Sequence, residues 1–332
     1  MIPFSILDLS PVPEGLDVGD ALDQSRQMAR KAEEHGYKRI WLAEHHGMPG
    51  IASAATAVVI GHVGAATSRI RIGSGGVMLP NHSPLVIAEQ FGTLEALFPG
   101  RVDLGLGRAP GTDMRTARAL RRNLEAGAEN FPHDIIELQR LLGPPTEDQP
   151  ILAVPGANSN VPLWLLGSSL YSAHLAAALG LPYAFASHFA PDMLMDAIAI
   201  YRERFQPSAS LDQPYVMVGV MGVAADTDEE AARLFTSAQQ QFINLRRNVR
   251  GKFPRPVDTM DGLWSDMERI SVDHTLRYAA VGAPATLEAK LSAFLGETGA
   301  DELIVSMPIH DIAARLRSVE LFAGLPMMEK AP

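Results

Sequence analysis

The amino-acid sequence predicts one (β/α)8 barrel, a TIM barrel, that spans residues 1–332 and carries insertions after its fourth and seventh strands. Short β-branched or apolar runs alternate with longer helical patterns along the whole chain, which is the order of parallel βαβ units. Eight such runs occur, more than an open doubly wound sheet of this length usually has. With 332 residues, 47% of them hydrophobic, the chain can bury a large core.

The predicted strands are short and rich in Val, Ile, Leu and aromatic residues, and the helices between them are longer and end near Gly or Pro. We predict strands at residues 4–9, 39–43, 70–74, 102–106, 163–166, 183–186, 215–223 and 302–306. We predict helices at residues 18–35, 53–67, 84–98, 112–142, 169–179, 191–205, 228–250, 284–297 and 309–322.

Two irregular stretches interrupt this alternation. Residues 143–162 are rich in Pro and Gly and are interpreted as an excursion before the fifth strand. Residues 251–268 follow the seventh strand and its helix, on the side where barrel enzymes build their sites, and are interpreted as a lid or as a surface insertion.

Composition excludes several classes of protein. The chain has no cysteine, which removes disulfides, thiolate metal ligands and a cysteine nucleophile. Its formal net charge of −10 makes nucleic acid and anionic membranes unfavourable partners. The N-terminus lacks a basic segment, and the longest apolar stretch, residues 51–66, is broken by polar side chains. We therefore expect a cytoplasmic protein without a membrane span.

The polar and glycine-rich motifs that follow predicted strands are the candidates for chemistry, because barrel active sites form where strands end. After the second strand, Glu44, His45 and His46 are adjacent, and neighbours on an extended segment point to opposite sides. A shared metal is therefore the weaker interpretation. A single imidazole acting as acid, base or hydrogen-bond donor is better supported, and a purely structural histidine is the alternative.

Three further motifs could hold an anion or a flat ligand. Arg108 follows a glycine-rich strand end that misses the dinucleotide spacing, and it could grip a phosphate or pair with Asp103 or Asp113. Gly167, Ser168 and Ser169 precede a helix and form either an anion site or an ordinary N-cap. Gly75 and Gly76 indicate a bulge or a close backbone approach.

Together these motifs resemble the luciferase-like monooxygenase family, in its single-chain, luciferase-alpha-like branch, from the first strand to the final helix. The matching runs are residues 41–46, 72–80, 100–108, 165–169 and 180–191, in family order. The resemblance implies a TIM barrel that holds FMN without a covalent bond. Light emission and a long-chain aldehyde substrate are not implied, because Gly107 and Gly167 replace a cysteine and a glutamate of luciferase.

The resemblance also assigns roles to residues of this sequence. It implies phosphate contacts near Arg108 and Ser168, an isoalloxazine ring against Gly75 and Gly76 with a cis bond between them, and a catalytic imidazole at His45. Glu44 is the next catalytic candidate. The further cofactor candidates are Gly107, Gly167 and Ser169, and the substrate-pocket candidates are Leu7, Asp8, Phe185, Ser187, His188 and Phe189.

The implied reaction is oxygenation of a small organic substrate by O2 and reduced FMN, through a C4a-hydroperoxide, in a pocket that excludes water. No NADH fingerprint is present, so a separate flavin reductase would supply the reduced cofactor. A deazaflavin-dependent hydride transferase and a flavin-binding protein without turnover are the alternatives.

The apolar residues 51–66 also bear on assembly. Nearly every face of a helix formed by this segment would be apolar or small, which is unusual for a helix half exposed on a barrel. We expect a homodimer that buries this helix with help from the helix that begins near Pro84.

Overall fold

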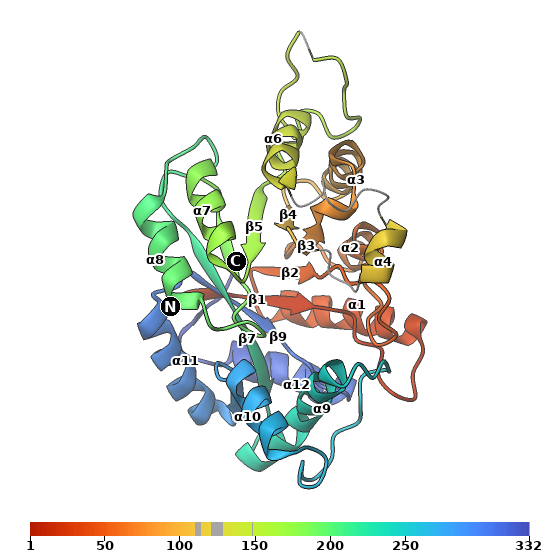
Figure 1. Cartoon of the computed structure of the whole chain (residues 1–332), viewed down its shortest axis with the longest axis vertical. Helices are drawn as coiled ribbons and strands as arrows, with labels where there is room; N and C mark the ends of the chain where they lie inside the picture. Colours follow the sequence, from red (N-terminus) through yellow and green to blue (C-terminus); the bar gives the residue numbers. More distant parts are fainter. Residues whose placement is uncertain (110–113, 121–128, 148, 332) are drawn as a thin grey trace.

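Eight parallel strands close into a barrel surrounded by helices in the computed structural model, which describes residues 1–109, 114–120, 129–147 and 149–331 (Figure 1). Each strand pairs in parallel with the next, and β9 closes the ring by pairing with both β7 and β1. This confirms the predicted fold class. The barrel strands are β1 (Ile2–Asp8), β2 (Arg39–Leu42), β3 (Arg71–Met78), β4 (Val102–Gly107), β5 (Leu163–Gly167), β6 (Tyr183–Phe185), β7 (Val216–Ala224) and β9 (Glu302–Ser306).

The helices cover the outside of the barrel, with α7 and α8 on one side and α2 and α3 on another (Figure 1). They are α1 (Val18–Glu34), α2 (Thr56–Gly64), α3 (Pro84–Leu97), α4 (Met114–Leu120), α6 (Phe131–Leu142), α7 (Leu170–Leu179), α8 (Leu194–Arg204), α9 (Asp228–Arg246), α10 (Asp266–Thr275), α11 (Pro284–Thr298) and α12 (Ile312–Ala323). None of them, within the described residues, has the length and apolar character to cross a membrane.

Two helix predictions were too long. The helix expected at residues 53–67 begins at Thr56, because Ser53 donates hydrogen bonds to the carbonyls of Leu9 and Ala43 and holds the chain in an extended path. The helix expected at residues 112–142 is divided into α4 and α6, and α6 starts anew with a proline in its first turn. Residues 112, 113 and 121–128 of that prediction lie outside the described residues.

Among the described residues, two short strands and one α-helix were not predicted. Strand β8 (Ala280–Gly282) pairs in parallel with the end of β7, and β10 (Met328–Glu329) pairs in parallel with the start of β1. Strand β10 has two residues and β8 consists of Ala, Val and Gly, so neither carries the run of β-branched or aromatic residues that predicts a strand. Helix α10 begins inside the stretch interpreted as irregular, where Ser265 and Glu268 form a capping box.

Alternate residues of the strands fill two different cores, as the two-residue period of a strand requires. One set packs outward against the helices, and Ile40, Ile72 and Leu104 belong to it. The other set fills the barrel interior, where the rings of Trp41 and Trp164 meet edge to face at 5.1 Å.

A buried ionic network closes the barrel at the end where the strands begin. Arg39 donates from Nε to Glu302 at 2.8 Å and from Nη1 to Asp103 at 2.7 Å. All three side chains are almost inaccessible to solvent. Arg71 contacts Asp103 as well, and Trp41 donates to the same carboxylate at 3.2 Å. These residues fix the lower part of the barrel, which leaves the opposite end for a ligand.

Candidate functional site

The ends of all eight barrel strands surround a cavity of about 610 Å³. Its deepest wall comes from interior residues such as Leu7, Trp41 and Ile304, and its upper wall comes from the loops that follow the strands. A cavity of this size at the carboxyl ends of barrel strands is the usual place for a small-molecule site. The cavity is lined mainly by apolar side chains and backbone, with a few polar groups among them.

The third strand contributes a flat stretch of backbone to this cavity. The peptide bond between Gly75 and Gly76 is cis, as predicted, and the pairing with β4 shifts register there. A Cβ on Gly76 would lie 2.7 Å from the carbonyl oxygen of Gly105, and one on Gly75 would lie 2.7 Å from Leu7. Both glycines are therefore required by close packing within the barrel, and both border the cavity.

Arg108 stands at the end of β4 and borders the same cavity. Its guanidinium lies 4.0 Å from the centre of the Tyr171 ring, which belongs to the first turn of α7. Asp103, one of the carboxylates considered as its structural partner, is occupied by Arg39 and Arg71 instead. Asp113, the other, lies outside the described residues.

The start of α7 lies beside this arginine. Ser169 is the N-cap residue, with φ of −140° and ψ of 165°, yet its side chain makes no capping hydrogen bond. Ser168 and Ser169 both border the cavity. An uncapped helix start offers backbone N–H groups and hydroxyls to an anion. A Cβ on Gly167 would lie 2.0 Å from the Ser172 hydroxyl, so the glutamate that luciferase carries at this position does not fit this backbone.

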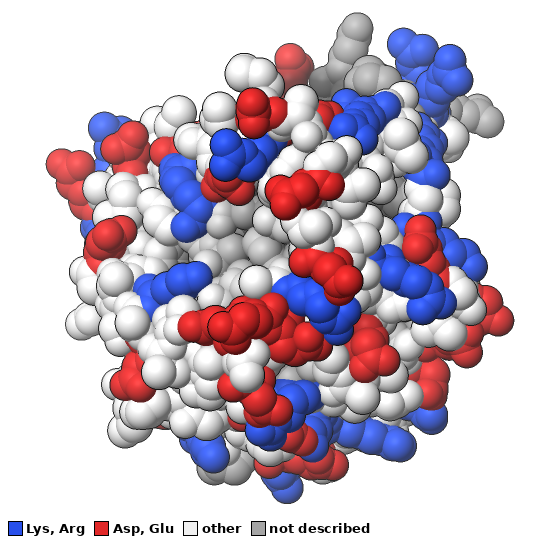
Figure 2. Space-filling model, turned by 90° about the horizontal axis from the view of Figure 1, so that it is seen from below, with Lys and Arg blue, Asp and Glu red and all other residues white. Residues whose placement is uncertain are grey.

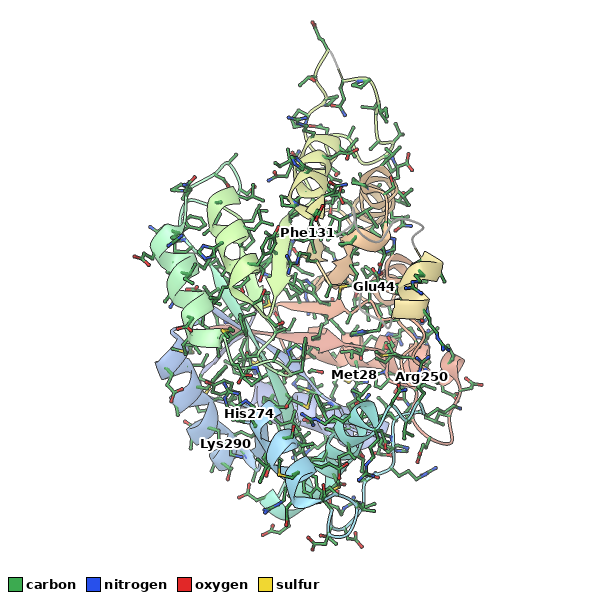
Figure 3. All side chains as sticks on the ribbon, viewed as in Figure 1. Met28, Glu44, Phe131, Arg250, His274 and Lys290 are labelled. Atoms are coloured by element: carbon green, nitrogen blue, oxygen red, sulfur yellow. The ribbon has the colours of Figure 1, made fainter. Side chains whose placement is uncertain are left out.

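The Glu44, His45 and His46 motif divides between the cavity and the protein interior. His45 borders the cavity, but Glu44 is buried behind it and does not. The Glu44 carboxylate accepts hydrogen bonds from the Met78 backbone at 3.0 Å, from His46 at 2.7 Å and from His82 at 2.8 Å. Figure 3 labels Glu44 on the side of the molecule where α4 lies.

The surroundings of Glu44 keep it ionised. Burial opposes the negative charge and on its own would raise the Glu44 pKa. The pKa is nevertheless held below its usual value by the hydrogen bond and charge of His82 and by hydrogen bonds from His46 and the Met78 backbone. The ligating atoms of Glu44, His46 and His82 lie within 4.8 Å of one another. His82 is 38 residues from Glu44 and follows no predicted strand, so this cluster was not predicted from the sequence.

The six substrate-pocket candidates also divide. Leu7, Phe185, His188 and Phe189 border the cavity, and Asp8 and Ser187 do not. Asp8 is buried and accepts from Arg315 at 2.7 Å and from the Ser10 backbone at 3.0 Å. Ser187 donates to the Gly219 carbonyl at 2.6 Å and so ties the loop after β6 to β7.

Among the residues of the cavity wall that were not predicted, Arg315, Phe253 and Tyr171 contribute a charged or aromatic side chain. Arg315 reaches the wall from α12, and Phe253 reaches it from the stretch interpreted as a lid or surface insertion. Phe253 is anchored by backbone hydrogen bonds to Val12 at 2.8 Å and Glu14 at 2.9 Å. No sequence signal marks Arg315, Phe253 or Tyr171, because each reaches the site only through the closure of the barrel.

Comparison with known proteins shows similarity over nearly the whole chain. The family model for luciferase-like monooxygenases matches residues 2–302. A luciferase-like monooxygenase of Escherichia coli strain K12 is 54% identical over 320 residues, which are 96% of this chain and 96% of that protein. The crystal structure of apo-MsnO8 has a TM-score of 0.89 at 33% identity and covers 99% of this chain and 100% of its own.

A more distant solved structure shares the fold. The oxygenating constituent of 3,6-diketocamphane monooxygenase from Pseudomonas putida, in complex with FMN, has a TM-score of 0.72 at 18% identity, covering 100% of this chain and 99% of its own.

Proposed function

Because this chain belongs to the luciferase-like monooxygenase family, we propose that it is a monooxygenase that binds reduced FMN in the cavity at the mouth of its barrel. The observation that carries the proposal is the arrangement of Arg108 over Tyr171, beside the uncapped start of α7. A cationic side chain and a free helix start together form a cradle for a phosphate. The rest of the cavity wall is apolar enough to receive a flat aromatic ring.

The residues present fit FMN at both ends of the cavity. Arg108, Ser168 and Ser169 would hold the phosphate, and the backbone of Gly75 and Gly76 would face the ring system. The FMN complex of the distant diketocamphane enzyme supports this cofactor. Reduced FMN, when bound, would supply the electrons that activate O2 for transfer of one oxygen atom to an organic substrate. The apolar wall would keep water out of the site.

His45 is the residue that we expect to handle protons. It is an imidazole on the cavity wall, so it can hold or move a proton at the reacting centre. Glu44 supports His45 from behind. The Glu44 backbone N–H donates to the Gly76 carbonyl at 3.3 Å, and the Glu44 carboxylate accepts a hydrogen bond from the Met78 backbone. A flavin reductase is the partner that we expect to deliver the reduced cofactor.

Arg108→Ala tests the proposal directly. We expect the variant to bind FMN more weakly by roughly 1.5 to 3 kcal/mol, because a charge-assisted contact to the phosphate is lost. Riboflavin, which lacks the phosphate, should bind wild type and variant almost equally. Fluorescence titration measures both affinities. Equal losses for the two ligands would show that Arg108 acts on the protein and not on the phosphate.

The identity of the cofactor and the oxygen chemistry need separate measurements. The mass and absorption spectrum of the ligand that copurifies distinguish FMN from a deazaflavin. Supplying photoreduced FMN and ¹⁸O2 to the protein, with a panel of ketones, aldehydes and thioethers, tests turnover by mass spectrometry of the products. One labelled oxygen atom per product molecule is expected. Absence of label from every product would contradict the monooxygenase assignment.

A further inference from the structure

His188 is an imidazole in the cavity wall that the proposed chemistry does not yet use. It lies in the loop after β6, next to Ser187, whose hydrogen bond to the Gly219 carbonyl fixes this loop against β7. Its ring meets the Phe189 ring edge to face at 4.8 Å. The side chain is thus held by packing on two sides while one edge of the ring borders the cavity.

Neither ring nitrogen of His188 has a hydrogen-bond partner among the described residues. Nδ1 is sealed from solvent and has none, and a Cβ built on Gly219 would lie only 2.4 Å from it. Glycine at position 219 therefore makes room for this ring. Because Nδ1 is packed against Gly219, which does not border the cavity, Nε2 is the ring nitrogen left for a ligand on the cavity side. Polar groups without partners are rare in protein interiors, so an unpartnered Nε2 in a cavity wall indicates a group supplied by a ligand.

The imidazole is neutral under physiological conditions. Burial, and then the nearby His45, lower the pKa of His188 to about 4. A neutral imidazole has one N–H donor and one bare nitrogen acceptor. An N–H at Nδ1 would face Gly219 without an acceptor, so the favoured tautomer carries its proton on Nε2.

We propose that His188 is a substrate-binding residue that donates a hydrogen bond from Nε2 to an oxygen acceptor, such as a carbonyl, on an uncharged and mainly apolar substrate. The inference rests on the proposed function, since it assigns the space beside the flavin to the substrate. The cofactor contacts come from β3, β4 and β5, and His188 follows β6, so it faces the part of the cavity that those contacts leave free. A neutral donor favours a ketone or aldehyde over a carboxylate.

The test uses the FMN-loaded full-length protein and ¹³C-labelled 2-octanone, with octanoate as the charged comparison. We expect wild type to bind 2-octanone more tightly than octanoate, and to shift the carbonyl stretch of the bound ketone to lower frequency in isotope-edited infrared spectra. In His188→Leu the ketone should bind about tenfold more weakly, since one hydrogen bond is lost, and the carbonyl shift should disappear. FMN affinity should stay within twofold.

His188→Asn is the matched variant, because its side-chain amide keeps a donor; it should recover part of the carbonyl shift. The proposal is overturned if wild type does not bind 2-octanone, if the carbonyl stretch is the same in wild type and His188→Leu, or if the leucine variant loses FMN instead. The readout does not depend on turnover. A carbonyl shift without any oxygenated product would therefore refute the proposed function and leave the role of His188 standing.

Discussion

His45 and His46 are neighbours in sequence but occupy different environments, and from this difference we expect His45 to affect turnover and His46 to affect stability. His45 borders the cavity, whereas His46 bonds the buried Glu44 carboxylate at 2.7 Å. Extended backbone explains the divergence, since successive side chains point to opposite sides. The alternation foreseen from the sequence therefore holds at this motif, with His45 toward the ligand and His46 toward the protein.

Exchange of each histidine for alanine should show this separation. His45→Ala should keep FMN affinity within a few-fold and reduce product formation by roughly 100-fold or more, because the group that handles the proton is lost. His46→Ala should retain turnover and lower the free energy of unfolding by about 1.5 to 3 kcal/mol, since one bond to a buried carboxylate is removed. Product formed per O2 consumed and urea unfolding measure the two effects. A reversed result would assign the catalytic imidazole to His46.

The pKa of His188 predicts a pH dependence of stability. Its folded-state value of about 4 lies below the unfolded value of about 6.5. Between these values the unfolded chain binds the extra proton, so this residue lowers the unfolding free energy by up to about 1.4 kcal/mol per pH unit as the pH falls from 6.5 to 4. His188→Leu should flatten that slope, as measured by urea unfolding at a series of pH values. His174→Leu, on the exposed face of α7, is the control and should leave the slope unchanged. Equal slopes in wild type and His188→Leu would contradict the neutral imidazole.

At the scale of elements, the barrel strands show which features of the fold a hydrophobic pattern can predict and which it cannot. The eight barrel strands were predicted within a few residues because buried apolar side chains are frequent in short segments between longer helical patterns. The inward-facing charges Arg39, Asp103 and Glu302 gave no such signal. Each looks like an ordinary strand end in the sequence, and only the closure of β2, β4 and β9 into one ring brings them together.

Arg39→Ala tests what this network contributes. Removal of the guanidinium takes one cationic partner from each of two buried carboxylates, which keep only Arg71 and Lys38, so the free energy of unfolding should fall by about 3 kcal/mol. Arg317→Ala breaks exposed ion pairs with Asp226 and Glu320 and should cost less than about 1 kcal/mol. Urea unfolding compares the two variants. Similar losses in the two variants would show that the buried network adds little to stability. The FMN affinity of the folded Arg39→Ala protein should be unchanged, because the network lies at the end of the barrel opposite the cavity.

At the scale of the whole molecule, the sequence predicted the barrel and several residues from the strand ends that line the cavity, but not the rest of the cavity wall. The motifs at strand ends were sufficient to predict that Arg108, Ser168 and His45 border the cavity, because the fold places the carboxyl ends of all the strands at one mouth of the barrel. Asp8 and Ser187 were misplaced, since their neighbours in space, Arg315 and Gly219, are far away in the chain. Side-chain direction at the end of a strand depends on such partners.

The charge distribution agrees with a small-molecule function. Acidic and basic side chains are interspersed on the face shown in Figure 2, without a large region of one sign. The excess of acidic residues gives the net charge of −10. On the described residues of this face there is no basic stripe of the kind that binds a phosphate backbone.

Few apolar side chains of the helices expected at the dimer interface are exposed. Most large apolar residues of α2 pack inward, with Val59, Ile60 and Val63 buried, so the barrel itself accounts for much of the apolar character of this segment. Val58, however, is 73% exposed on α2, and Val86 is 43% exposed on the adjacent α3. We still expect these two helices to meet a second copy of the chain.

Val58→Asp should break that assembly. A carboxylate placed in an apolar interface loses its hydration without gaining a partner, which costs several kcal/mol and should raise the dimer dissociation constant by about 100-fold or more. Val249→Asp is the matched control, since Val249 is 52% exposed just beyond the end of α9 and belongs to neither α2 nor α3. Light scattering at micromolar concentration should show a dimer for wild type and Val249→Asp and a monomer for Val58→Asp. A monomeric wild type would refute the expected dimer, and a dimeric Val58→Asp would place the interface on another face of the barrel.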